Sequence, residues 1–175
     1  GLAVPDSVML IVSPGCCGRN TSVLSSMRAY QDRFYYLLMD ETDIVTGRHL
    51  KKIPKAVAEI CEGLKKKPSV VMICITCVDA LLGTDMERVC HKAEEYAGVP
   101  VRPCYMYALT REGRKPPMVH VRQSVYSLLE PKKKKGNVVN LLGYFSPLTD
   151  DCELYDLLHG AGVKTIHEIS RCKDY

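Results

Sequence analysis

The residues of this chain best suited to chemistry are cysteines that follow predicted strands. Cys16 and Cys17 lie in the segment SPGCCGRN (13–20), between an expected strand and an expected helix. The glycines permit close backbone approach, and a helix N-terminus favours a negative species such as a thiolate. The loop lacks the GxGxxG spacing of a dinucleotide site. It therefore indicates either a functional thiol or an ordinary turn.

A second pair, Cys74 and Cys77, forms a CxxC segment at the end of the most continuously apolar predicted strand. A zinc site would need a second CxxC or a histidine pair, and the sequence has neither. A thioredoxin-like site would need the pair to open a helix. Strand alternation allows Cys74 to face the core, whereas Cys77 lies past the strand end and is better placed to bind a ligand.

The other cysteines and the histidines are more simply structural. Nine of the 175 residues are cysteine, a share below that of disulfide scaffolds, and no secretory signal is recognisable, so we expect reduced thiols in the cytoplasm. Cys61 and Cys90 fall on apolar helix faces, Cys104 is core or edge, and Cys172 stays a site candidate. No histidine has ligand spacing to another, so we expect a structural or surface role for His49, His91, His120, His159 and His167.

A basic cluster follows the fourth predicted strand. Arg111, Arg114 and Arg122 form either a solvated surface or a site for an anionic substrate or cofactor group. With two Phe and no Trp, the chain has no aromatic stacking platform, so no nucleic-acid binding is expected. No apolar run approaches the roughly 18 residues of a membrane span, so we expect no membrane partner.

The elements that must position these residues alternate between strands and helices. Strands are predicted at 7–13, 34–39, 69–74, 99–105, 138–143 and 163–169, with helices at about 21–32, 50–64, 85–96, 118–129 and 152–158. Residues 40–47 are predicted to be a polar loop, and Pro54 fits its helix only in the first turn. The pattern predicts an α/β, three-layer, doubly wound, mainly parallel sheet of Rossmann-like type. We expect a single domain over 1–175, cut from a longer subunit.

In such sheets ligands bind beyond the carboxyl ends of the strands, where the strand order reverses. The loops expected at that edge are 14–20, 40–47, 75–84, 106–117 and 144–151. Two of them carry the cysteines named above.

The order of motifs resembles that of the nitrogenase component 1 type oxidoreductases over nearly the whole chain. The segments that carry the resemblance are SPGCC (13–17), DIVTG (43–47), ITC (75–77) with LGTD (82–85), and VNLLG (139–143). The resemblance implies the first Rossmann-like domain of that family. It also implies that Cys17 and Cys77 are thiolate ligands of an iron–sulfur cluster of [4Fe–4S] type, with Cys16 as a possible alternate. The chain resembles nitrogenase-like proteins and not a true nitrogenase, since nothing supports dinitrogen as the substrate.

The resemblance leaves three functions open. The leading hypothesis is an oxidoreductase domain whose cluster takes electrons from an ATP-dependent iron–sulfur reductase, beside a homologous partner subunit or a second copy. The alternatives are a scaffold that assembles or carries a metal cofactor, and a cluster-free domain that binds an anionic metabolite at the arginines. A cluster normally takes four protein ligands, so two cysteines rarely suffice, and we expect the isolated domain to lack the cluster.

Overall fold

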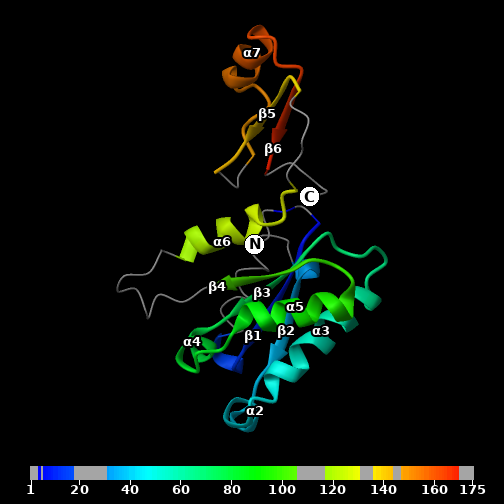
Figure 1. Ribbon diagram of the computed structural model, residues 1–175, viewed down its shortest axis with the longest axis vertical. Helices are drawn as coiled ribbons and strands as arrows, with labels where there is room; N and C mark the ends of the chain where they lie inside the picture. The colour runs from blue at the N-terminus through cyan, green and yellow to red at the C-terminus, as the bar shows by residue number, and fades with distance from the viewer. Residues whose placement is uncertain are drawn as a thin grey trace.

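The centre of the fold is a parallel four-stranded sheet (Figure 1). The computed structural model describes Val4 and residues 6–17, 31–105, 117–130, 136–143 and 147–169. The sheet has the order β2-β1-β3-β4, with strands β1 (Val8–Ser13), β2 (Phe34–Leu38), β3 (Val71–Ile75) and β4 (Val101–Tyr105). Every residue of β1 and β3 is buried. The sheet confirms the predicted α/β fold.

Two layers of helices cover this sheet, because side chains alternate between the two faces of a strand. One face packs against α3 (His49–Gly63) and α5 (Met86–Ala97), which lie side by side in Figure 1. The other face packs against α6 (Pro117–Tyr126). Leu10 and Ile73 belong to the first core cluster, whereas Ile11 belongs to the second. The strands are therefore sandwiched between apolar layers, as a buried parallel sheet requires.

The strand order reverses between β1 and β3. The chain passes from β1 to β2 on one side and then returns past β1 to place β3 on the other side. The two strands pair in parallel, with Val12 opposite Ile75, so their carboxyl ends lie at the same edge. This edge is the switch point at which doubly wound sheets bind ligands.

The predicted loop 40–47 is wrong, because it contains the helix α2 (Glu41–Thr46). The Asp40 carboxylate accepts a hydrogen bond of 2.7 Å from the backbone N–H of Asp43, which caps the first turn. Gly47 ends the helix in the left-handed conformation, with φ 66°. The polar composition of the segment concealed these caps.

The prediction that Pro54 fits its helix only in the first turn is also wrong. Pro54 is the sixth residue of α3 and so lies beyond the first turn. It cannot donate the backbone hydrogen bond of that position. Its side chain is buried, so apolar contact offsets part of that loss.

The other predicted helices differ little from the observed ones. Asp85 caps α5 by accepting from the N–H of Arg88, and Gly98 ends it with φ 65°. A short helix, α4 (Cys77–Leu81), lies in the predicted loop 75–84. Most of the helix predicted at 21–32 lies outside the described residues, and its end is the 3-10 turn η1 (Gln31–Arg33).

The last two predicted strands form a separate sheet. β5 (Val138–Leu141) pairs in parallel with β6 (Thr165–Glu168), and α7 (Glu153–Gly160) connects them. Figure 1 shows this unit beyond α6, away from the four-stranded sheet. Within the unit, the Glu168 carboxylate accepts from the N–H of Leu148 and the hydroxyl of Tyr155. A single domain over 1–175 stays a prediction.

Candidate functional site at the β1/β3 switch point

Three cysteines lie at the switch point. Cys16 and Cys17 follow the end of β1, and Cys77 is the first residue of α4, directly after β3. Cys16 is exposed, whereas Cys17 and Cys77 are half-buried. Neighbouring strands lie about 4.8 Å apart, so loops that leave adjacent strand ends begin close together. The fold therefore places all three candidate ligands at one edge.

Cys16 and Cys77 both affect the ionisation of Cys17. The Sγ atoms of Cys16 and Cys17 are 3.9 Å apart. The pKa of Cys17 is raised, first by burial, then by the hydrogen bond with Cys16, and further by the negative charges of the Cys16 and Cys77 thiolates. Thiolates at these three positions would repel one another. A bound cation would reverse that effect and stabilise them.

We expect Cys16→Ala to lower the pKa of Cys17, because it removes a hydrogen bond and a like charge that both raise it. At any pH below the pKa of Cys17, the variant then has more Cys17 thiolate and reacts faster with iodoacetamide. The rate is measured by mass spectrometry across a pH series. Buried Cys74, whose pKa is raised to about 12, is the unreactive internal control. An unchanged pH profile for Cys17 would contradict the expectation.

Buried polar atoms without partners gather at the same edge. Ser13 Oγ, Thr76 Oγ1, Asp43 Oδ1 and Asp79 Oδ2 have no hydrogen-bond partner, and the only other such atom among the described residues is Arg122 Nε. Asp43 Oδ1 does form an ion pair with Arg48, at 3.9 Å. Ser13 ends β1, and Thr76 directly follows β3. An unpaired buried polar group costs about 1–3 kcal/mol, so these atoms are the exceptions among the buried polar groups of the described residues.

Two buried carboxylates at this edge were missed by the sequence analysis. Asp43 in α2 accepts a hydrogen bond of 2.6 Å from Lys52, and this contact is the main reason that the pKa of Asp43 is lowered. Asp79 in α4 bonds the ring of His49, which is buried and structural as predicted. The sequence signal that points to these two carboxylates is their position, since both lie in loops expected at the ligand-binding edge.

The predicted arginine site is only partly described. Arg111 and Arg114 lie outside the described residues, and half-buried Arg122 belongs to α6. The anion site therefore stays a prediction.

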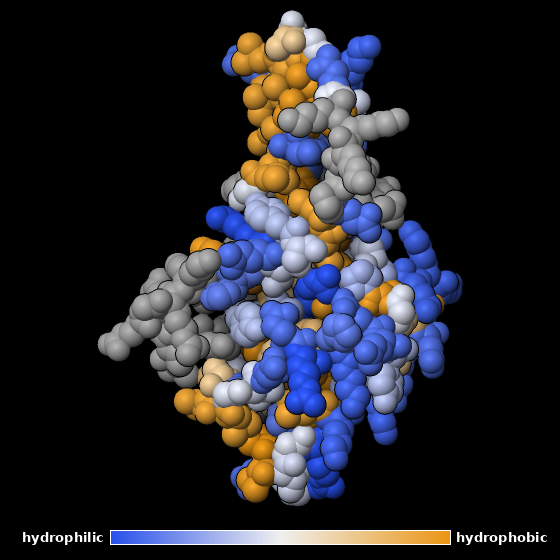
Figure 2. Space-filling view, in the orientation of Figure 1, coloured by the Kyte–Doolittle hydropathy of each residue, from blue (hydrophilic) through white to orange (hydrophobic). Residues whose placement is uncertain are grey.

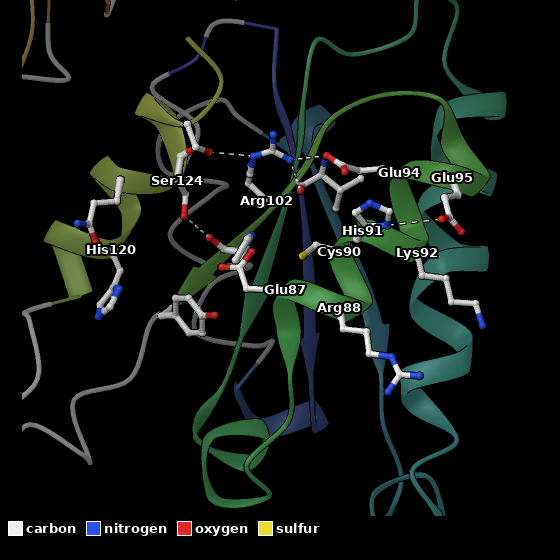
Figure 3. Close-up of a pocket in the computed structure, with 15 residues that line it drawn as sticks. Glu87, Arg88, Cys90, His91, Lys92, Glu94, Glu95, Arg102, His120 and Ser124 are labelled. Atoms are coloured by element: carbon white, nitrogen blue, oxygen red, sulfur yellow. Dashed lines mark hydrogen bonds and ion pairs between the residues drawn. The ribbon is translucent and has the colours of Figure 1, made fainter. Parts of the chain in front are cut away.

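A cavity of about 880 Å³ lies between α5, β4 and α6 (Figure 3). Figure 3 shows Arg102 reaching Glu94, and its Nε also donates to Ser127 at 2.9 Å. None of the three switch-point cysteines lines this cavity, so it is separate from the candidate site.

Four of the other cysteines lie where packing was expected, whereas half-buried Cys152 precedes α7. Cys61, Cys90, Cys74 and Cys104 are buried, and burial raises the pKa of Cys90 to about 12. Cys172 lies outside the described residues. Within the described segments, no three His, Cys, Asp or Glu side chains converge closely enough to hold a metal ion. Within these segments, the three switch-point cysteines therefore do not form a metal site by themselves.

Comparison with known proteins decides the family. Residues 1–171 match the family described as nitrogenase component 1 type oxidoreductase. The chain belongs to this family. No helix within the described segments is both long and apolar enough to cross a membrane.

Relatives in this component 1 family carry a more specific name. The nitrogenase iron-molybdenum cofactor biosynthesis protein NifE of Rhizobium meliloti is 32% identical over 127 residues, covering 71% of this chain and 26% of that protein. The protein of the same name from Nostoc is 27% identical over 175 residues, covering 95% of this chain and 36% of that protein. This chain thus spans about a quarter to a third of these relatives.

A solved structure shows the same fold. The structure described as "Nitrogenase Cp1 at pH 6.5" has a TM-score of 0.69 and 18% identity, and the match covers 99% of this chain and 39% of that one. At this identity the likeness supports the component 1 fold alone.

Proposed function

We propose that this chain is part of a scaffold on which a metal cofactor is assembled or carried. Cys17 and Cys77 are the thiolate ligands in this proposal, with Cys16 as a third or alternate ligand. The observation that carries it is the placement of these cysteines after the carboxyl ends of β1 and β3, where the strand order reverses. Relatives that are named as cofactor biosynthesis proteins favour a scaffold over a turnover enzyme.

The residues present suit part of an iron–sulfur site. Soft thiolate ligands select iron–sulfur clusters, and such a cluster supplies redox chemistry when bound. Two or three thiols fall short of the usual four ligands, so the remaining ligands would come from other chain segments or from a partner subunit.

The surface beside the thiols is suited to a protein partner. Val45 of α2 and Leu81 of α4 are 85% and 75% exposed, and Leu82 is 51% exposed. Figure 2 shows apolar side chains gathered over the region of α4. Exposed apolar side chains in a group favour an interface. We therefore include a homologous subunit or a second copy in the proposal, together with an ATP-dependent reductase that supplies electrons.

The test is anaerobic purification of the complete subunit with its partner, followed by iron and sulfide analysis and two functional assays. A scaffold is expected to transfer its metal cargo once to an acceptor protein and to show no multiple-turnover reduction when the reductase and ATP are added. Sustained turnover would support the oxidoreductase function instead. A complex free of iron and sulfide would leave the cluster-free anion-binding function.

A further inference from the structure

Helix α4 is held to the fold by a buried polar contact of Asp79 and by partly buried Val78, which packs against the apolar core. Asp79 is the only buried residue of this five-residue helix, while Leu81 at its end is mostly exposed. So short a helix is unstable by itself and depends on tertiary contacts. The most deeply buried side chain of the helix that begins with Cys77 is therefore a carboxylate.

The partner of that carboxylate is His49, the first residue of α3. Its Nε2 lies 3.0 Å from Asp79 Oδ1, and both side chains are almost fully buried. Its Nδ1 lies 3.0 Å from the backbone oxygen of Asp43 in α2. One imidazole ring thus links α2, α3 and α4, the last of which begins with Cys77.

The hydrogen bonds restrict where the protons are. The carbonyl oxygen of Asp43 can only accept, so His49 Nδ1 carries a proton and donates it. One further proton then lies between His49 Nε2 and Asp79 Oδ1, whichever atom holds it. The pair carries no net charge in either form, which is why it can be buried.

The same carboxylate also closes the segment after α4. The Thr84 hydroxyl donates to Asp79 Oδ1 at 3.3 Å, and the Thr84 backbone N–H donates to the Asp79 carbonyl at 3.0 Å. Hydrogen bonds are directional, so the contacts of Asp79 fix the rotation of α4 about its axis as well as its distance from the core. An apolar side chain at position 79 would hold the helix without setting its rotation.

We propose that His49 and Asp79 are positioning residues that hold the Cys77 thiol in its place at the switch point before any metal binds. This inference rests on the proposed function only in one respect, namely that the Cys77 thiol binds a metal cofactor. The contact itself is a property of the metal-free chain and can be tested there.

Two substitutions at His49 separate its two bonds. In His49→Gln the amide nitrogen takes the place of Nε2 and can still donate to Asp79. In His49→Asn it takes the place of Nδ1, so the bond to Asp43 is kept and the bond to Asp79 is lost. Val57→Ala, on a buried position of α3 in the apolar core, is the control for a general loss of stability.

The measurements are hydrogen exchange of the Leu82 and Thr84 amides, which bond back to α4, and the alkylation rate of Cys77 relative to exposed Cys16 at one pH. We expect His49→Asn to lower amide protection about tenfold or more, because it leaves Asp79 as a buried group without its hydrogen-bond partner, and to speed the alkylation of Cys77. His49→Gln and Val57→Ala should keep the wild-type ratio of the two alkylation rates.

An unchanged ratio in His49→Asn overturns the proposal, even where the amide protection falls, because His49 is then only structural. An equal change in Val57→Ala also overturns it. Titration with Co²⁺, followed by thiolate charge-transfer absorbance, tests the proposed function separately. Absence of Co²⁺ binding in the wild type contradicts the metal site. The role of His49 is still decided by the amide exchange and the ratio of alkylation rates.

Discussion

Replacing Cys17 and Cys77 together by alanine is expected to lower the iron that purifies with the anaerobic subunit complex by more than about tenfold. A four-iron cluster is normally held by four thiolates, and this variant removes two of them. Cys16 remains, but a single exposed thiol beside an emptied half-site cannot replace both. Iron and acid-labile sulfide per chain, with the visible absorbance of the complex, provide the measurement.

The matched control for this variant is the double replacement Cys61→Ala with Cys90→Ala. Both of these thiols are buried in α3 and α5, away from the switch point, so their loss removes packing and no ligand. We expect the control to keep its iron. Wild-type iron content in the Cys17→Ala, Cys77→Ala variant would contradict the assignment of both ligands.

The location of the candidate site could be predicted because it follows from local patterns. The continuous apolar runs of β1 and β3 indicate buried parallel strands, and both switch-point loops begin where those runs end. Carboxyl ends of parallel strands share an edge, so Cys17 and Cys77 had to approach each other once β1 and β3 were neighbours. The alternation of strands and helices along the chain does not determine that β1 and β3 are neighbours.

The features that the sequence did not reveal depend on distant contacts. Asp79 is one charged residue in a short segment, and only its bond to His49, 30 residues away in sequence, makes it an anchor. Residues 40–47 are polar enough for a loop, yet the Asp40 cap makes a helix. β5 and β6 have the pattern of further strands of the same sheet. The pattern alone does not show that they pair with each other and not with the edge strand β4.

Ile73→Ala is expected to lower the free energy of unfolding by about 2–5 kcal/mol, the largest stability effect that we predict. Ile73 is the middle residue of β3 and is fully buried in the core cluster beneath α3 and α5. Truncation removes apolar contacts and leaves a cavity that a central strand, paired on both sides, cannot easily close. Urea unfolding followed by circular dichroism measures the change.

Val138→Ala in β5 is the matched control, because it truncates another β-branched strand residue, one that is 44% exposed. We expect its effect to stay within about 0.5 kcal/mol, as for most surface substitutions. Since Cys17 and Cys77 follow the two central strands, the stability of this sheet is also what keeps the candidate ligands together. Equal losses in the two variants would contradict the view that the β1/β3 core, and not the β5/β6 unit, supports the site.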